Sequence, residues 1–200
     1  TEAIRTELRR RLDLKPGAEI VLAASGTDTT FAALALAKVQ AGTPLVSLFL
    51  APDETGSGIP KAAAGCHFLG ATSLGHAGCP VEGLGGTDVT AEWVAIRKPW
   101  GAPRPDSEID AEISERVAQI VASGRRCLLH VLDAAKTGIG APSYAAIDRL
   151  TEQHGDALTV LVDACQMRVS TSTPSAMLGR GWMVQITGSK FFAGPPFSGA

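Results

Sequence analysis

Short apolar runs alternate with amphipathic segments along most of the chain. Runs of about four to eight apolar residues between turn residues are typical of buried strands, whereas apolar positions three or four apart are typical of a helix packed on one side. These patterns predict strands at residues 19–24, 45–50, 89–96, 127–132, 158–162 and 183–186. They predict helices at residues 2–13, 31–39, 107–123, 142–153 and 174–179.

Helix and buried strand alternate three times, which is typical of a parallel sheet covered by helices. We therefore expect an α/β fold with three layers, a mostly parallel sheet and helices on both faces. The expected division is an N-terminal helical segment at residues 1–18 and one large domain at residues 19–200. Ligands of such sheets bind at the carboxyl ends of the strands, so the polar residues there are the candidates for a site.

The composition excludes several classes of partner. A formal net charge of -2 gives no basic surface for nucleic acid or an anionic membrane, and no run approaches the roughly twenty apolar residues of a membrane span. The charged first residues do not resemble a secretory signal. The four cysteines form no Cys-x-x-Cys pair and have no histidine at zinc-ligand spacing, so we expect reduced thiols, no metal and a cytoplasmic protein.

The turn at residues 25–28, Ser-Gly-Thr-Asp, joins a predicted strand to a predicted helix. In this arrangement unpaired N–H groups and the positive end of the helix dipole face an anion. Thr27 and Asp28 are also ordinary N-cap residues, so a cap without a ligand is the alternative. The turn lacks Gly-x-x-x-x-Gly-Lys and the full Gly-x-Gly-x-x-Gly pattern, so a small phosphate is favoured over a nucleotide.

The sequence loses periodicity after Pro52, where glycine-rich stretches continue to residue 86. Long loops inside a domain tend to carry or cover sites. His67 and His76 fall here, and His67 beside Phe68 is a weak ligand candidate. Solvated loop histidines are the commoner case.

A carboxylate, an amide and a lysine follow the last two predicted strands. Asp163 comes after four apolar residues, so its charge at the mouth of a dry sheet needs a partner, and Gln166 can donate or accept. Lys190 follows the next strand, and the connection between parallel strands brings it towards the same edge. It either reaches solvent or stays in apolar surroundings, next to Phe191 and Phe192, with a lowered pKa, as Schiff-base lysines do.

Together these parts make a binding site for pyridoxal 5'-phosphate (PLP): the lysine bonds the aldehyde, the aspartate pairs with the pyridine nitrogen, and the helix end holds the phosphate. Three segments carry a resemblance to a known family: residues 25–28, Val-Asp-Ala-Cys-Gln at 162–166, and Thr-Gly-Ser-Lys at 187–190. The chain resembles PLP-dependent fold type I enzymes, in the branch of class V aminotransferases and cysteine desulfurases.

The resemblance implies roles for single residues. It implies that Asp163 pairs with the ring nitrogen, that Gln166 contacts the ring hydroxyl, and that Lys190 is the catalytic residue and forms the internal aldimine. The full set of cofactor-binding residues that it implies is Gly26, Thr27, Asp28, Asp163, Gln166, Thr187, Ser189 and Lys190. It also implies an amino acid substrate, a homodimer, and a C-terminal lobe that is missing here or supplied by a separate chain.

Three departures from the family pattern leave the reaction open. Ser189 stands where a histidine usually precedes the lysine, residues 53–56 stand where a ring-stacking histidine is common, and the region of Asp133 replaces a common asparagine. Transamination is the default expectation; elimination, desulfuration and decarboxylation are alternatives. A noncatalytic scaffold subunit and a nicotinamide or nucleotide enzyme are hypotheses from other classes.

Overall fold

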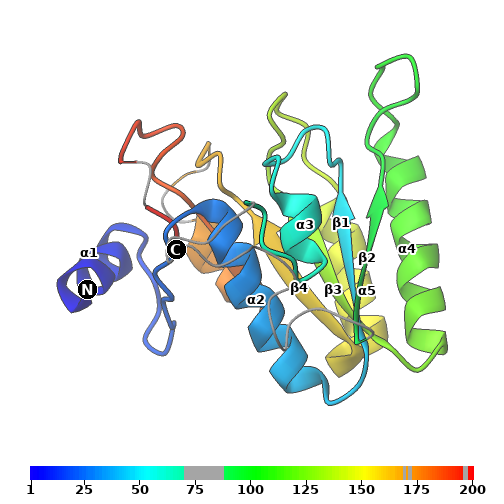
Figure 1. Cartoon of the computed structure of the whole chain (residues 1–200), viewed down its shortest axis with the longest axis horizontal. Coiled ribbons are helices and arrows are strands. Elements are labelled where there is room, and N and C mark those ends of the chain that lie inside the picture. The colour runs from blue at the N-terminus through cyan, green and yellow to red at the C-terminus, as the bar shows by residue number, and fades with distance from the viewer. Residues whose placement is uncertain (70–87, 169, 171–172, 196–197) are drawn as a thin grey trace.

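Five parallel strands form one sheet in the order β2-β1-β3-β4-β5 (Figure 1). The computed structural model describes residues 1–69, 88–168, 170, 173–195 and 198–200. The strands are β1 (Leu45–Leu50), β2 (Val89–Val94), β3 (Arg126–Leu132), β4 (Leu158–Asp163) and β5 (Met183–Gln185). Their carboxyl ends share one edge of the sheet, where the loops after β1, β3 and β4 gather.

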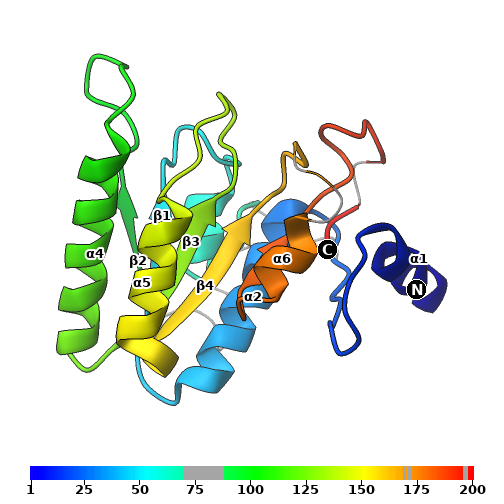
Figure 2. The same cartoon turned by 180° about the vertical axis from the view of Figure 1, so that it is seen from behind.

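Helices cover both faces of this sheet. The helices are α1 (Glu2–Arg11), α2 (Gly26–Ala41), α3 (Ile59–Ala63), α4 (Asp106–Ala122), α5 (Tyr144–His154) and α6 (Thr173–Leu178), with a 3-10 turn at Gly155–Ala157. Figure 1 shows α2 and α3 on one face, and Figure 2 shows α4, α5 and α6 on the other. The three-layer α/β expectation is therefore confirmed.

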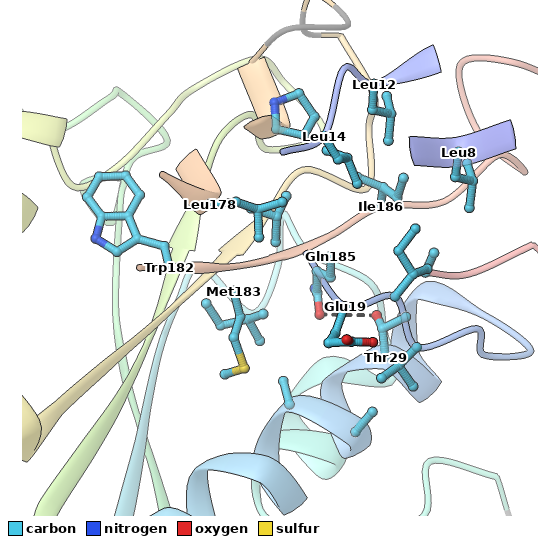
Figure 3. Close-up of a pocket in the computed structure, with 18 of the residues that line it drawn as sticks. Leu8, Leu12, Leu14, Glu19, Thr29, Leu178, Trp182, Met183, Gln185 and Ile186 are labelled. Atoms are coloured by element: carbon cyan, nitrogen blue, oxygen red, sulfur yellow. Dashed lines mark hydrogen bonds between the residues drawn. The ribbon is translucent and has the colours of Figure 1, made fainter. Parts of the chain in front are cut away.

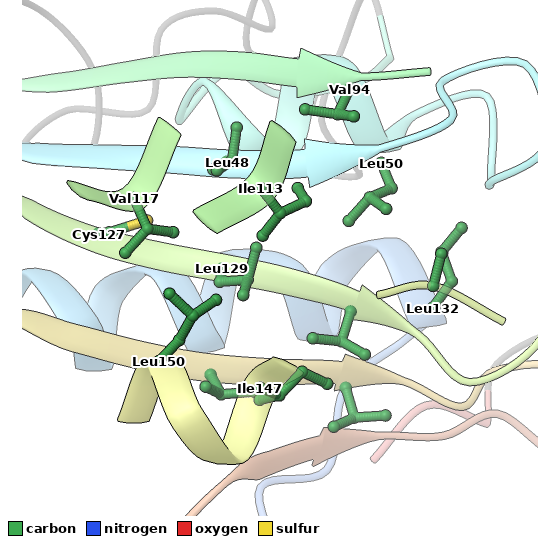
Figure 4. Close-up of a cluster of buried hydrophobic side chains, with 14 of the residues drawn as sticks. Leu48, Leu50, Val94, Ile113, Val117, Cys127, Leu129, Leu132, Ile147 and Leu150 are labelled. Carbon is green, nitrogen blue, oxygen red and sulfur yellow. The ribbon is translucent and has the colours of Figure 1, made fainter. Parts of the chain in front are cut away.

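The main core lies between the sheet and the pair α4 and α5 (Figure 4). Leu48 and Leu129 point from the strands to this side and meet Ile113 and Ile147 of the helices, all fully buried. Alternate strand residues, such as Leu45, pack against α2 on the opposite face. Burial on both faces explains why these strands are continuous apolar runs without alternation.

Most predicted elements form with small shifts at their ends, but the strand predicted at residues 19–24 was wrong. This segment is extended and makes one isolated antiparallel bridge, between Ala23 and Gly199. Residues 198–200 are the only described backbone that pairs with it, and they are too few to extend a ladder. Helix α4 begins one residue before its predicted start at residue 107, with Pro105 as the N-cap and no side chain capping it.

The expectations for the cysteines, for membrane spans and for metal sites can be compared with the described residues only. Cys127 and Cys165 are buried free thiols and Cys66 is half-buried, whereas Cys79 and His76 lie outside the described residues. Within the described ranges, no helix is both long and apolar enough to cross a membrane, and no cluster of side chains could hold a metal ion. The division into residues 1–18 and 19–200 stays a prediction.

Candidate active site

Ser25 caps the helix at the predicted phosphate turn. Its hydroxyl accepts a hydrogen bond from the Asp28 amide at 3.2 Å and donates one to Asp28 Oδ2 at 2.7 Å. The alternative that Thr27 or Asp28 is the cap was wrong, although the spacing of Ser25 and Asp28 resembles a capping box and could have shown it. Among the described residues, the amides of Gly26 and Thr27 have no hydrogen-bond partner, so two donors remain at the positive end of α2.

The three segments that the sequence singles out meet at Gly26. A Cβ atom built on Gly26 would lie 2.7 Å from Cys165 Sγ and 3.7 Å from Thr187 Cβ. The first residue of α2 therefore packs against both the turn after β4 and the segment after β5. Only glycine fits this position without displacing the thiol, since real Cβ contacts are not this short.

Thr27 faces the loop after β1. A Cβ on Gly58 would lie 2.9 Å from Thr27 Cγ2, so this loop closes directly over the start of α2. His67 belongs to the same region, where its ring stacks on Phe68 at 4.9 Å and on Phe31 at 6.1 Å between centroids. Its Nδ1 accepts from the Leu69 amide at 3.2 Å, which gives the ring a structural role in an aromatic stack.

Thr187 and Ser189 form a hydroxyl pair beside Gly26. Thr187 is buried, its Oγ1 lies 2.9 Å from Ser189 Oγ, and it donates to the Ser198 carbonyl at 3.1 Å. Because the single proton of Thr187 is used by Ser198, Thr187 accepts from Ser189. This pair fixes the segment that carries Lys190.

Lys190 is exposed, and so are the two phenylalanines that follow it, Phe191 and Phe192. Of the two alternatives for the lysine, the structure agrees with the one in which it reaches solvent. The physical reason is the local turn: the Gly194 amide donates to the Gly188 carbonyl at 2.8 Å, and the loop between them leaves the sheet.

Asp163 is the last residue of β4 and its Oδ1 accepts a hydrogen bond from the Cys165 amide at 3.0 Å. The pKa of the Cys165 thiol is raised well above its ordinary value by burial and by the charge of Asp163, while the charge of Lys190 acts in the opposite direction. The carboxylate and the ammonium thus influence one thiol and lie on the same edge of the sheet. Gln166 is half-buried beyond them, and its side chain makes no hydrogen bond among the described residues.

Asp133 follows β3 on this edge. Its amide donates to the Asp163 carbonyl at 3.1 Å, and its Oδ1 accepts from the Tyr144 hydroxyl at 2.8 Å. Burial raises the pKa of Asp133, the bond from Tyr144 lowers it, and the charge of Asp163 raises it further. Sequence reasoning placed Asp133 at a strand end but missed Tyr144, because nothing in the spacing indicates that α5 turns its first residue towards this loop.

Glu54 occupies the loop after β1, where the family pattern suggests a ring-stacking residue. Its carboxylate is buried and bound by Arg97 and by the Thr137 hydroxyl. Burial raises the pKa of Glu54, but the hydrogen bonds from Thr137 and Arg97 and the charge of Arg97 outweigh it, so the net shift is downwards. This loop therefore holds a structural ion pair that ties the loops after β1, β2 and β3 together.

Comparison with solved structures places this arrangement among known folds. The histidinol-phosphate aminotransferase from Clostridium acetobutylicum matches 99% of the chain with 11% identity and a TM-score of 0.61. Rhodiola rosea 4-hydroxyphenylacetaldehyde synthase matches 98% with 14% identity and a TM-score of 0.60. Oryza sativa TDC with PLP and tryptamine matches 94% with 14% identity and a TM-score of 0.58.

The chain has the fold of PLP-dependent fold type I enzymes. It spans 48%, 42% and 38% of the length of these three structures, in the order given above. No protein-family model and no curated protein matches the chain.

The residues at this edge of the sheet fit a phosphate and a pyridine ring in part. In favour are the two free amides at the start of α2 and the carboxylate of Asp163 on the same edge, whereas the Ser189 hydroxyl donates its proton to Thr187. Asp28 is less suitable than predicted, since its carboxylate is bound to Ser25 and repels an anion. Thr187 is also engaged internally, through Ser198.

Proposed function

We propose that the chain is the cofactor-binding part of a PLP-dependent enzyme that acts on an amino acid, with transamination as the default reaction. The observation that carries this proposal is the contact at Gly26, which joins the helix start, the turn after Asp163 and the segment before Lys190. The fold that it shares with PLP enzymes supports it.

Each side chain has a distinct part in this proposal. The amides of Gly26 and Thr27 would bind the phosphate, and the hydroxyl of Ser189 would join them by turning its proton from Thr187 to the phosphate. Asp163 pairs with the ring nitrogen, and Gln166 contacts the ring hydroxyl. Asp28 acts through Ser25, by fixing the cap that presents the two amides.

Lys190 would hold the cofactor through its amine, and the same amine would move a proton at the substrate carbon next to the amino group. The bound cofactor supplies the electron-accepting ring for this chemistry. Closure of the site around Lys190 has to come from outside the described residues, since its side chain is exposed here. A homodimer or a C-terminal lobe would provide that cover, and the proposed location is the cytoplasm.

Lyase, desulfurase and decarboxylase activity remain alternatives within this proposal, as does the class V branch. A noncatalytic scaffold is a separate candidate, favoured by the exposure of Lys190 and by the carboxylate of Asp28 beside the predicted phosphate position.

A spectroscopic titration tests the proposal. PLP added at a stoichiometric concentration is expected to produce a visible absorption band that Lys190→Ala removes and Lys136→Ala, at another exposed lysine, retains. Equal bands in both variants would indicate unspecific reaction with surface lysines, and the absence of a band in the unaltered chain would favour the scaffold.

A further inference from the structure

The start of α5 reaches the carboxyl end of β3 through one side chain. The Tyr144 hydroxyl donates to Asp133 Oδ1 at 2.8 Å. The Tyr144 ring meets Trp182 edge-on at 5.7 Å, and the Arg180 guanidinium lies 5.9 Å from the ring centre. Figure 3 shows the Trp182 indole on the opposite side of the chain from the Met183 side chain, which is the side that faces α5. Tyr144 is therefore held both by ring packing and by a hydrogen bond at the strand end.

Helix α5 fixes Tyr144 independently of Asp133. Ser143 caps the helix by accepting from the Ala146 amide at 3.2 Å. Ser143 is itself bound to Asp110 of α4, through its amide at 2.8 Å and through its hydroxyl at 2.6 Å. Asp133, by contrast, follows β3 in a loop. Because groups on packed helices are held more precisely than groups on loops, Tyr144 sets the orientation of the Asp133 carboxylate.

Asp133 and Asp163 lie at the ends of neighbouring strands. Leu132 pairs with Asp163 in the register of β3 and β4, and the Asp133 amide donates to the Asp163 carbonyl at 3.1 Å. Burial raises the pKa of Asp133, the bond from Tyr144 lowers it, and the charge of Asp163 raises it further. Coulomb interactions are reciprocal, so the charge of Asp133 acts in turn on any proton or cation that Asp163 binds.

The two carboxylates lack a cationic partner of their own. Neither belongs to an ion pair in the described part of the chain, whereas Glu54 on the same edge is bound by Arg97. Arg180 acts on Tyr144, and Lys190 acts on Cys165. Uncompensated carboxylates favour a ligand that brings positive charge. The titratable groups on the surrounding elements are Tyr144, Asp148 and Arg180 on the side of α5, and Asp28, Glu54, Arg97, Lys136, Cys165 and Lys190 around the strand ends.

We propose that Asp133 supplies a second negative charge to the cofactor site and that Tyr144 is the positioning residue that holds this charge beside Asp163. This role rests on the proposed function, in which Asp163 pairs with the ring nitrogen. The charge of Asp133 stabilises a proton on that nitrogen through space, without contact with the ring. The ligand class that the pair of carboxylates selects is a heterocycle that becomes a cation when it binds.

A ligand without an aldehyde tests the proposal, because it cannot react with lysine. Pyridoxine 5'-phosphate with an isotopically labelled ring nitrogen is bound to the chain, and the NMR shift of that nitrogen is followed as the pH is raised. Asp133→Asn is expected to lower the pKa of the bound ring nitrogen by at least about 0.5, the scale expected for removal of a charge on a neighbouring strand end. The matched control is Asp156→Asn, which removes an exposed charge at the opposite end of β4 and should change this pKa by less than about 0.2.

Tyr144→Phe separates a positioning role from a structural one. It should lower the pKa of the bound ring nitrogen by at least about 0.3 when Asp133 is present, because the carboxylate loses the donor that holds it. In a chain that already carries Asp133→Asn it should have no further effect. An equal lowering in both backgrounds would overturn the proposal, and so would equal effects of Asp133→Asn and Asp156→Asn.

The same titration distinguishes this inference from the proposed function. Binding that Asp163→Asn weakens, with a ring nitrogen whose pKa is unaffected by Asp133→Asn, would overturn the role of Asp133 and leave the proposed function standing. Failure of the unaltered chain to bind pyridoxine 5'-phosphate would overturn both.

Discussion

At the scale of single residues, the missing side chain of Gly26 decides how the candidate site is assembled. The absence of a Cβ lets α2 begin directly against Cys165 and Thr187. The sequence shows this glycine inside a polar turn, but the thiol that it accommodates lies 139 residues further along, counting from 26 to 165. Such a contact depends on tertiary packing and cannot be predicted from local pattern.

We expect Gly26→Ala to destabilise the chain by about 1–3 kcal/mol, the usual cost of overpacking, because its Cβ would lie 2.7 Å from Cys165 Sγ. Cys165→Ala removes the sulfur, so in that background Gly26→Ala should cost much less. Urea unfolding of the two single variants and the double variant measures the coupling. Strictly additive effects would show that the thiol is not what excludes a side chain at this position.

The substitution Asp163→Asn removes the negative charge of the side chain and keeps its shape. The amide oxygen can still accept the bond from the Cys165 amide, so Tm should change little. Loss of a charge-assisted bond to the ring nitrogen, worth about 1.5–3 kcal/mol, should weaken PLP binding at least tenfold. Fluorescence titration with PLP measures the change. Unaltered affinity would remove Asp163 from the proposed site.

At the scale of elements, the buried strands were predicted well because each apolar run is covered on both faces. The strand prediction for residues 19–24 was wrong for the opposite reason. The composition of this segment suits a strand, but a strand forms only when it pairs with another, and the described partner is three residues long. The sequence left the exposure of Lys190 open as one of two alternatives, since the turn closed by Gly188 and Gly194 is a backbone feature without a clear sequence signal.

The pairing of β1 with β3 buries a histidine between the sheet and α2 and α3. His130 Nε2 lies 2.7 Å from Ser47 Oγ, and the ring meets Phe49 edge-on at 6.5 Å. Burial lowers the pKa of His130 to about 4. The folded protein therefore favours the neutral form of the His130 ring over the protonated form.

The lowered pKa of His130 predicts acid sensitivity. With an unfolded pKa of about 6.5, the stabilisation is complete above that value and is lost as the pH falls towards about 4, on the order of 2 kcal/mol between about pH 7.5 and about pH 5. His130→Leu combined with Ser47→Ala should reduce this loss. Urea unfolding at the two pH values measures it, and an equal loss in the double variant would contradict the assignment to His130.

At the scale of the whole molecule, the loops at the carboxyl ends of the strands form the candidate site. The described residues leave part of this end of the sheet exposed. Lys190, Phe191 and Phe192 are exposed beside the candidate site, and Val21 and Leu36 are exposed as well. The chain spans 38–48% of the length of the three solved structures compared above.

The central claim is that Lys190 is the residue that holds PLP. Borohydride reduction of the chain with stoichiometric PLP, followed by proteolysis and mass spectrometry, tests it most directly. The account predicts that the reduced cofactor is found on the peptide that contains Lys190, in preference to those that contain Lys136 or Lys61. Label spread evenly over exposed lysines, or concentrated on a lysine other than Lys190, would contradict it.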